Sequence, residues 1–535
     1  MLQCCRRIQA RFRVCSKHAR NRYLALPHLA SSRRNGTDIA GHQTRSHHRK
    51  TAYPSFKMAE STITTVNQIS LDGGEAGSTQ IVPIAPSKLG EFLDGANWRS
   101  QLTLDDWSLE LYDTADARHL VEAAQLLRNS TIPVAFPTET VYGLGADATR
   151  SEAVKGIYKA KQRPSDNPLI VHIASLQQLR CLLLGSRSAT NPSLYEPCTD
   201  PIPDIYKPLI EKFWPGPLTI LLPVPENSPL APETTAGLAT FGARMPRNLL
   251  ALALIKLADR PIAAPSANAS TKPSPTAAEH VYHDLAGRIE MIVDGGPCQV
   301  GVESTVVDGL VSPPVILRPG GVSIGQIREV KGWEKTTIAY EDKVLTEGKK
   351  EGPRAPGMKY RHYSPKAKVM LFESGRDCGI GDLAGAAGPR RRVGVVRTKR
   401  WKQIGTEENA LTNGQARAAN GITRPEARAQ HVVEHGGDLP IDPPLVQMLA
   451  EQSQYQARQI HETELATDDG AIEVLDISIG PDTIDIARGL FSALRDLDKK
   501  DLDAIIVEGI KDGNGDDVSA AVMNRLRKAA EVNVS

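Results

Sequence analysis

Short apolar segments of strand length, with few helical patterns between them, are the feature that most constrains the fold of this chain. Such segments predict strands at residues 132–136, 169–173, 218–222, 240–244, 261–264, 289–293, 305–307 and 315–317. Apolar residues at helical spacing predict helices from about residue 116 and at 205–213, 249–258 and 276–285, with a further helix capped by Ser151. A strict alternation of strand and helix would need more helices than these. The pattern therefore predicts a mixed α+β or α/β domain over about residues 105–330.

A second, smaller domain is predicted after the first. The chain has 535 residues, and single cores rarely grow past about 250–300 residues. From residue 366 to 535, strands and helices alternate, with strands predicted at 368–372, 391–396 and 503–510 and helices at about 487–497 and 519–530. This alternation fits a small α/β domain, which a polar insertion at about 400–470 interrupts.

Two connecting regions complete this organisation. Residues 58–104 are rich in Ser, Thr and Gly, which predicts a poorly ordered approach to the first domain. Residues 331–365 form a linker that ends in EGKKEGPRAPGMKYRHYSP. Its aromatic and basic end is unusual for a simple tether, which needs neither kind of side chain.

The first 57 residues have a charge composition of their own. They carry thirteen Lys or Arg and one acid, Asp38, whereas residues 58–535 carry 51 Lys or Arg and 61 Asp or Glu. A basic segment that contains Ser and almost no acid is typical of a mitochondrial transit peptide, although a disordered basic tail would look the same. Met58 follows directly and could start a form without the leader. The prediction is a cytoplasmic protein with a mitochondrial form.

Composition and cysteine spacing exclude several classes of protein. No apolar run approaches the roughly 20 residues of a membrane-spanning helix. The seven cysteines form no C-x-x-C pair, so no structural metal is expected. Because residues 58–535 are acidic overall, a general basic surface for nucleic acid is also absent.

The GLGADA sequence (residues 143–148) raises the question of a dinucleotide site. A Rossmann fingerprint needs the strand to run straight into the glycines and an acid at the end of the next strand. Here TET follows the strand, and LIVHI ends in no acid. No Walker sequence is present either. We therefore expect these glycines to serve a tight turn.

Basic and small polar residues gather in several short motifs. Lys161 and Arg163 lie in KAKQRPSDNPLIVH, where they could converge on phosphates, although a solvated basic face is the simpler interpretation. His172 lies in an apolar strand, where it could equally be a buried core residue. SAN (residues 266–268), GVEST (301–305) and LRPG (317–320) add hydroxyls and one arginine.

In this order, the motifs TETVYGLG, KAKQRPSDNPLIVHI, WPGPLT, ARMP, APSAN, GVEST and LRPG resemble those of the YrdC-type threonylcarbamoyl-AMP synthases. The resemblance is dense over about residues 115–330. It continues through APGMKYRHYSP into ARGLFSALRDLDKKDLDAIIVEG, which resembles the accessory domain of the long form of the family. It implies a YrdC-like open twisted sheet with a concave basic cavity, and a smaller Rossmann-like α/β domain at the C-terminus.

The resemblance implies an enzyme. Family members combine L-threonine, bicarbonate and ATP, with Mg²⁺ on the phosphates, and release pyrophosphate and threonylcarbamoyl-adenylate. A separate complex then transfers the threonylcarbamoyl group to the adenosine beside the anticodon of tRNA. Such chemistry needs positioning and neutralisation of phosphate charge rather than a covalent nucleophile, and no Ser/His/Asp triad is apparent. The alternative is an RNA-binding or ribosome-maturation module that uses the same basic concavity.

The family's site residues transfer by motif. Threonine would be bound by Thr140, His172, Arg244 and Ser304. The nucleotide would be bound by Arg163, Asn167, Thr240, Ala264, Ser266, Asn268, Arg318 and Tyr363. Lys161 and Arg163 would act on the phosphates or bicarbonate as catalytic residues, and Tyr363 would fold back from the linker as a lid over the nucleotide.

Overall fold

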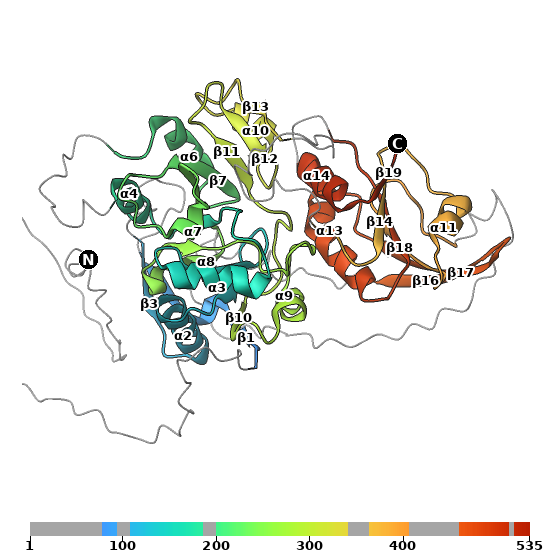
Figure 1. Cartoon of the computed structure of the whole chain (residues 1–535), viewed down its shortest axis with the longest axis horizontal. Coiled ribbons are helices and arrows are strands. Elements are labelled where there is room, and N and C mark those ends of the chain that lie inside the picture. Colours follow the sequence, from blue (N-terminus) through green and yellow to red (C-terminus); the bar gives the residue numbers. More distant parts are fainter. Residues whose placement is uncertain (1–77, 94–106, 186–199, 341–362, 406–458, 513–517) are drawn as a thin grey trace, which may run out of the picture. The chain divides into compact units, whose positions relative to one another are not determined.

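The computed structural model describes residues 78–93, 107–185, 200–340, 363–405, 459–512 and 518–535 (Figure 1). The predicted leader, most of the predicted approach and linker, and most of the predicted insertion lie outside the described residues. Within them, the structure contains a larger domain with a mixed sheet and a smaller domain with a mainly parallel sheet.

The larger domain is built on an eleven-stranded sheet in the order β1-β10-β4-β5-β9-β6-β8-β7-β11-β12-β13. Parallel and antiparallel pairs both occur along it, as in the parallel pair of β6 with β8 and the antiparallel pair of β7 with β8. The strand bounds are β1 Gln80–Pro83, β4 Val134–Phe136, β5 Gly143–Asp147, β6 Ile170–His172, β7 Leu218–Pro223, β8 Thr240–Arg244, β9 Ile262–Ala263, β10 Met291–Asp294, β11 Thr305–Asp308, β12 Val315–Arg318 and β13 Thr337–Ile338. A short hairpin of β2 (Gly90–Leu93) and β3 (Ser108–Leu111) stands beside it.

Helices cover this sheet because their apolar faces pack against its buried strands. The α-helices are α2 Ala115–Asn129, α3 Ser151–Lys161, α4 Leu176–Leu184, α6 Lys207–Phe213, α7 Pro232–Thr235, α8 Leu249–Ala258, α9 Ala278–Leu285 and α10 Ile324–Arg328, and the 3-10 helices are η2 Pro86–Lys88 and η4 Asp204–Tyr206. Helix α8 is apolar on nearly all sides and almost fully buried, and the Asn248 side chain caps it by accepting from two backbone N–H groups. Helix α2 packs on α8 and on β4, β5 and β10.

The glycines of GLGADA form strand β5 rather than the tight turn expected from the sequence. Strand β5 pairs antiparallel with β4 and β9, and close packing is the reason for glycine here. A Cβ on Gly145 would lie 2.7 Å from Phe136 Cε1 and 2.9 Å from Ile262 Cγ2, nearer than atoms approach without a shift.

Three further details differ from the sequence predictions. Strand β1 lies in the segment for which no element was predicted, where it pairs in parallel with β10. Arg150, not Ser151, is the N-cap of α3, because Arg150 has the extended backbone and Ser151 is the first helical residue, whose hydroxyl donates to Glu233 Oε2 at 2.5 Å. Residues 460–467, within the predicted insertion, form a strand of the smaller domain.

The smaller domain has a six-stranded sheet in the order β16-β17-β15-β18-β14-β19, parallel except at the edge strand β16. Its strands are β14 Lys368–Phe372, β15 Arg392–Arg397, β16 Ile460–Thr467, β17 Gly470–Ser478, β18 Ala504–Glu508 and β19 Val532–Val534, and its helices are α11 Ile380–Ala386, α13 Thr483–Asp498 and α14 Ser519–Ala529. Helices α13 and α14 pack together on one side of the sheet, and α11 lies away from them on the other (Figure 1). The predicted α/β class of both domains is confirmed.

The core beneath α13 and α14 extends into the larger domain. Val141, which follows β4, and Val302, in the loop before β11, belong to the same buried apolar cluster as Leu490 and Phe491 of α13. Gly301 adopts φ +78°, and a Cβ there would lie 2.3 Å from Arg488 Cα. The loop can therefore approach α13 this closely only without a side chain at residue 301.

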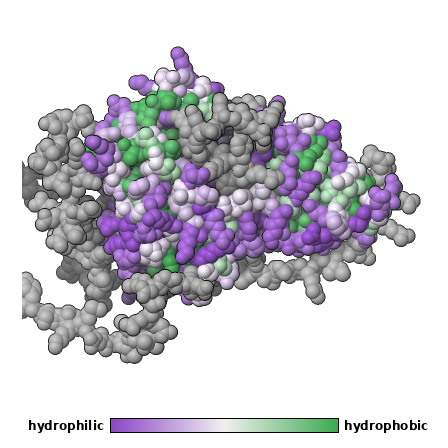
Figure 2. Space-filling view, viewed as in Figure 1, coloured by the Kyte–Doolittle hydropathy of each residue, from purple (hydrophilic) through white to green (hydrophobic). Residues whose placement is uncertain are grey.

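The visible face of the described residues is mostly polar. Figure 2 shows hydrophilic side chains over much of the visible face, with smaller apolar patches between them. Among the described residues, the most exposed large hydrophobic side chain is that of Ile484, at 63%. No helix in this part of the chain combines the length and apolar character needed to cross a membrane.

Candidate functional site

A cavity lies where several strands of the larger domain end. His172 ends β6, Arg244 ends β8 and Arg318 ends β12, and all three side chains line it. The full lining comprises Thr138, Thr140, Val141, Gly143, Arg163, Ile170, His172, Arg244, Ala264, Pro265, Ser266, Glu303, Ser304, Arg318 and Tyr363. Most of the site residues predicted from the sequence are thus brought together, and three of them are arginines.

Arg244 is held rigidly at one side of the cavity. Its Nη2 lies 2.7 Å from Glu139 Oε1, and its Nη1 donates to Thr140 Oγ1 at 2.9 Å. Its Nε donates to the Gly216 carbonyl at 3.2 Å. Both members of the ion pair are buried, so Glu139 offsets the cost of burying the arginine and fixes its direction. Glu139, the middle residue of TET, was not predicted as part of the site.

His172 is neutral in this environment. The ring is buried, Nδ1 lies 3.2 Å from the Ile170 carbonyl, and Phe136 contacts it edge-on. Burial and then the charge of Arg244 lower the pKa of His172 to about 3. A neutral imidazole at the edge of the cavity can donate or accept a hydrogen bond without adding a second positive charge next to Arg244.

Arg318 and Ser304 also line the cavity and are bound to each other. Arg318 donates through Nε and Nη2 to the Ser304 carbonyl, at 3.0 and 2.8 Å, and through Nη2 to the Ser304 hydroxyl at 3.0 Å. The same hydroxyl lies 2.7 Å from Thr219 Oγ1 of β7. Burial, and then the nearby charge of Arg525, lower the pKa of Arg318 to about 10, so the guanidinium remains charged at neutral pH.

Glu303 is a further charged residue of the site that sequence reasoning missed. Its carboxylate accepts from Ser274 Oγ at 2.5 Å and from Arg525 Nε, on α14 of the smaller domain, at 2.9 Å. Burial alone would raise the pKa of Glu303, but the charges of Arg525 and Arg318 outweigh burial and hold the pKa at about 2. The only signal in the sequence was the acid within GVEST, next to a predicted site serine.

Arg163 lines the cavity just beyond the end of α3. Helix α3 stops at Lys161, and Gln162 takes the left-handed conformation that turns the chain. The Nη2 atom of Arg163 is buried and has no hydrogen-bond partner within the described part of the chain. Burial lowers the pKa of Arg163. A buried guanidinium nitrogen without a partner is costly, and an anionic ligand in the cavity would satisfy it.

The loop after β9 presents Ala264, Pro265 and Ser266 to the cavity. Lys161 holds this loop through hydrogen bonds to its backbone. Lys161 Nζ donates to the carbonyl of Asn268 at 2.5 Å and to that of Ser266. Burial and then the charge of Arg163 lower the pKa of Lys161 well below its usual value. Lys161 therefore contacts the backbone of the loop instead of pointing into the cavity.

Four predicted site residues do not line the cavity: Lys161, Asn167, Thr240 and Asn268. Thr240 begins β8, whereas Arg244 ends it, so the two are separated by roughly 13 Å of strand. Asn268 ties the loop together, since its Nδ2 donates to the carbonyls of Ala269 and Lys272. Asn167 is buried, and its Oδ1 has no hydrogen-bond partner among the described residues.

Tyr363, the last residue of KYRHY, is buried at the edge of the cavity. Its ring stacks on Phe491 of α13 with the centroids 5.2 Å apart, and the Arg525 guanidinium carbon lies 5.9 Å from its centroid. Burial and then Glu303 raise its pKa to about 12. The rest of this motif, residues 359–362, lies outside the described residues.

The carboxylates near the cavity are already engaged by cations, Glu139 by Arg244 and Glu303 by Arg525. In the part of the chain that the structure describes, no cluster of three or more His, Cys, Asp or Glu side chains could hold a metal ion. A metal in this cavity would therefore depend on ligand oxygens for most of its coordination.

Two protein-family models match the chain and together span most of the two domains. The first, described as "Telomere recombination" and covering the Sua5, YciO and YrdC proteins, matches residues 126–320. The second, "Threonylcarbamoyl-AMP synthase, C-terminal domain", matches residues 322–531.

Individual proteins agree with these models. The threonylcarbamoyl-AMP synthase of Schizosaccharomyces pombe is 45% identical over 426 residues, 77% of this chain and 88% of that protein. That of Bacillus subtilis is 39% identical over 79% of this chain and 97% of that protein. The crystal structure of P. abyssi Sua5 complexed with L-threonine matches with a TM-score of 0.57 and 32% identity, over 85% of this chain and 100% of that one. The resemblance seen in the sequence is confirmed, and the chain belongs to the threonylcarbamoyl-AMP synthase family.

Proposed function

We propose that this protein makes L-threonylcarbamoyl-adenylate from L-threonine, bicarbonate and ATP, with release of pyrophosphate. The product would be the donor from which a tRNA-modifying complex forms threonylcarbamoyl-adenosine beside the anticodon. The observation that carries the proposal is the convergence of Arg163, Arg244 and Arg318 on one cavity that also presents the hydroxyls of Thr140 and Ser304. Membership of the family, and the L-threonine in the related P. abyssi structure, support it.

Threonine would bind at the side of the cavity formed by Arg244. That guanidinium is fixed by Glu139, and the hydroxyl of Thr140 lies beside it. The carboxylate of the amino acid would pair with Arg244, while His172 and Ser304 contact its polar groups. Because His172 is neutral, the carboxylate would be held mainly by one charge, at a defined position.

ATP would bind in the part of the cavity that Arg163 and Arg318 line. Arg163 and Arg318 would neutralise its phosphates, and Ala264 and Ser266 would contact the nucleotide. Lys161 and Asn268 would then act indirectly, because they hold the loop that carries Ser266. Tyr363 would close the cavity over the nucleotide and keep water from the adenylate.

The reaction can proceed without a covalent intermediate on the protein. The threonine amine forms an N–C bond to bicarbonate carbon as the elements of water leave, which gives a carbamate. A carbamate oxygen then attacks the α-phosphorus of ATP, and the bond from this phosphorus to the bridging oxygen of pyrophosphate breaks. The arginines contribute by positioning the reactants and stabilising charge on the phosphates.

Magnesium would enter as part of the substrate, as MgATP. Glu303, the carboxylate that lines the cavity, already accepts hydrogen bonds from Ser274 and Arg525. The protein would therefore orient the phosphates, and the ion would be held by phosphate oxygens and water, as is usual for Mg²⁺.

Pyrophosphate release by the full-length chain tests the proposed function. With MgATP present, we expect release only when threonine and bicarbonate are added together, because the carbamate that attacks ATP needs both. Release with neither addition would identify a nucleotide hydrolase instead. If a demonstrably folded protein released none under any condition, while its RNA affinity fell steeply with salt, the RNA-binding alternative would replace this proposal.

For localisation, we propose that residues 1–57 direct a mitochondrial form and that initiation at Met58 gives a cytosolic one. The support is the basic, nearly acid-free composition of the leader. A C-terminal fluorescent tag should report mitochondria and cytosol for the complete chain and cytosol alone when translation starts at Met58. Identical cytosolic patterns from both would contradict the mitochondrial form.

A further inference from the structure

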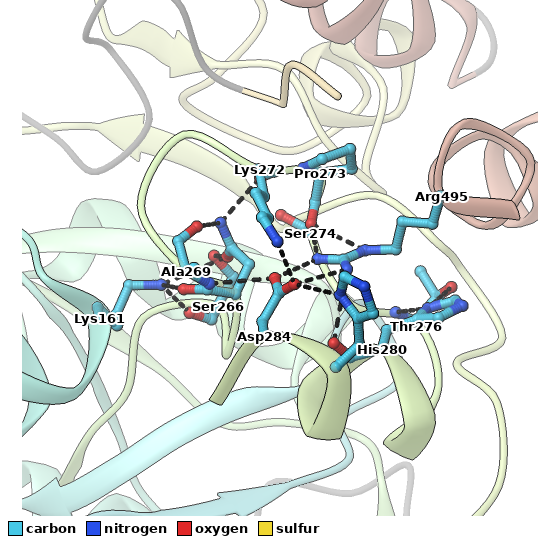
Figure 3. Close-up of polar contacts among 12 residues, drawn as sticks. Lys161, Ser266, Ala269, Lys272, Pro273, Ser274, Thr276, His280, Asp284 and Arg495 are labelled. Carbon is cyan, nitrogen blue, oxygen red and sulfur yellow. Dashed lines mark hydrogen bonds and ion pairs between the residues drawn. The ribbon is translucent and has the colours of Figure 1, made fainter. Parts of the chain in front are cut away.

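Arg495, on α13 of the smaller domain, is a buried charge at the contact between the two domains. It is 5% exposed, and it forms a fork on Asp284 of α9, with Nη2 2.7 Å from Oδ2 and Nη1 3.2 Å from Oδ1. Its Nε also donates to the Pro273 carbonyl at 3.1 Å. Figure 3 shows the Arg495 side chain reaching Asp284 and the loop beside it. Neither residue lines the cavity, and no role in the proposed reaction accounts for them.

Two of the three partners of Arg495, Pro273 and Asp284, belong to, or hold, one segment of the larger domain, residues 269–274, which we call the connecting segment. The third partner is the His280 carbonyl, 3.5 Å from Nη1. It begins directly after Asn268 of the SAN motif and ends before α9. Asp284 accepts from the Ala269 backbone N–H at 3.1 Å and lies 3.2 Å from Lys272 Nζ. Pro273 is part of the segment itself. Arg495 thus fixes the segment at three of its six positions, two of them through Asp284.

The connecting segment is also fixed to the wall of the cavity. Asn268 Nδ2 donates to the carbonyls of Ala269 and Lys272, at 2.9 and 2.8 Å. The Ser266 hydroxyl, which lines the cavity, donates to Asn268 Oδ1 at 2.5 Å. A continuous series of short polar contacts therefore leads from Arg495 through Asp284 and the segment to Ser266. Figure 3 shows Lys161 and Ser266 at one end of this series and Arg495 at the other.

One residue of the connecting segment has a strained backbone conformation. Thr271 has φ +74°, which is unfavourable for a β-branched residue. Conformations of this kind persist where the surroundings hold them in place. Here Ser364 N–H donates to the Thr271 carbonyl at 2.9 Å, and Arg495 holds Pro273 two residues further on. Loss of Arg495 would release one end of a strained loop.

We propose that Arg495 is a positioning residue for nucleotide binding: through Asp284 and Pro273 it holds the connecting segment, and with it Asn268 and Ser266, in the arrangement that the cavity requires. The accessory domain then has a defined task in the reaction. This inference rests on the proposed function, in which Ser266 contacts ATP. It concerns the nucleotide rather than threonine, because Arg244 is fixed by Glu139 and Thr140, and Glu139 accepts its other hydrogen bonds from the backbone N–H groups of Arg247 and Val300.

The test compares Arg495→Met and Arg495→Lys with Arg488→Met in the full-length protein. Arg488 is a matched control, because it lies two turns earlier on α13 and also reaches the catalytic domain, but through the Gln299 carbonyl rather than the connecting segment. Binding of a non-hydrolysable ATP analogue with Mg²⁺ is measured by titration calorimetry. The KM values for ATP and threonine come from pyrophosphate release, and circular dichroism checks folding.

We expect Arg495→Met to raise the analogue Kd and the KM for ATP by about 5- to 150-fold, the usual range for coupling between sites. The KM for threonine at saturating ATP should stay within about twofold of the wild-type value, since Arg244, which would take the threonine carboxylate, is fixed by residues outside the connecting segment. Arg495→Lys keeps the charge but loses the fork, so its Kd should be intermediate. Arg488→Met should bind the analogue like the wild type.

A folded Arg495→Met protein with wild-type analogue affinity would overturn the proposal, and so would an equal loss in Arg488→Met. If Arg495→Met does not fold, Arg495→Lys decides: unchanged affinity overturns the proposal and weakened affinity supports it. Equal rises in the KM values for ATP and threonine would also overturn it. If the wild-type protein itself does not bind the analogue, the proposed function is wrong. If the wild type binds it and the Arg495 variants bind it equally well, only the role of Arg495 is wrong.

Discussion

Replacing Arg163 by alanine should lower kcat for threonine-dependent pyrophosphate release by about 10²–10³-fold, equivalent to about 2.7–4 kcal/mol of transition-state stabilisation. In the structure, Arg163 lines the cavity and its Nη2 is buried without a hydrogen-bond partner among the described residues. Its orientation is set by the turn that ends α3, so little rearrangement would be needed when phosphate arrives. Arg163→Lys would keep the charge without the planar fork and should fall between the wild type and the alanine variant.

The control for this experiment is Lys155→Ala on the same helix. Lys155 is exposed and pairs with Glu152 at 2.8 Å, so its removal should leave kcat unchanged. Steady-state kinetics at saturating substrates distinguish a loss of turnover from a loss of affinity. If Arg163→Ala kept more than about a tenth of the wild-type rate, Arg163 would have no catalytic role.

Arg525→Met should destabilise the folded protein by about 3–5 kcal/mol at pH 7, because it leaves the buried carboxylate of Glu303 without its cation. The double variant Arg525→Met with Glu303→Gln should recover most of this loss, since the unpaired charge is then absent. The measurement is the urea midpoint of the full-length protein, followed by circular dichroism. Arg527→Met is the control, because Arg527 pairs with Glu373 and Asp512 within the smaller domain.

The pH dependence of this effect has a definite sign. In the wild type the pKa of Glu303 is lowered to about 2, so its stabilising contribution is complete above the unfolded value near 4.5 and is lost as the pH falls towards 2. Without Arg525, the strongest cause that lowers the pKa of Glu303 is gone, so this pKa rises. The penalty in Arg525→Met should therefore be largest at neutral pH and shrink as the pH is lowered from 4.5 towards 2, where the wild-type protein also loses the contribution of ionised Glu303. A penalty that grew on acidification, or that Arg527→Met matched at every pH, would contradict the assignment to Glu303.

Much of the fold could be predicted because its buried strands are continuous apolar runs. The predicted strands at 218–222 and 240–244 correspond closely to β7 and β8, and the predicted helix at 249–258 is α8. Strand β5 was missed because glycine has low strand propensity, and its presence depends on packing against Phe136 that no local pattern reveals. Strand β1 was missed because it is short and largely exposed, so it lacks an apolar run.

The candidate site was predictable to the extent that its residues lie in short motifs. Arg163, Arg244 and Arg318 were all predicted and all line the cavity. The pair of Glu303 and Arg525 was not, because the two residues are 222 positions apart and each looks ordinary in its own segment. Lys161 was predicted as a residue that acts on phosphate, yet it contacts backbone carbonyls, and sequence cannot distinguish these two uses of a lysine.

The apolar cluster that joins Val141 and Val302 to α13 and α14 means that the two domains share part of one hydrophobic core. Cutting the chain between the domains would expose both valines to water, together with the faces of α13 and α14 that cover them. Each domain expressed alone should therefore be less soluble than the intact chain.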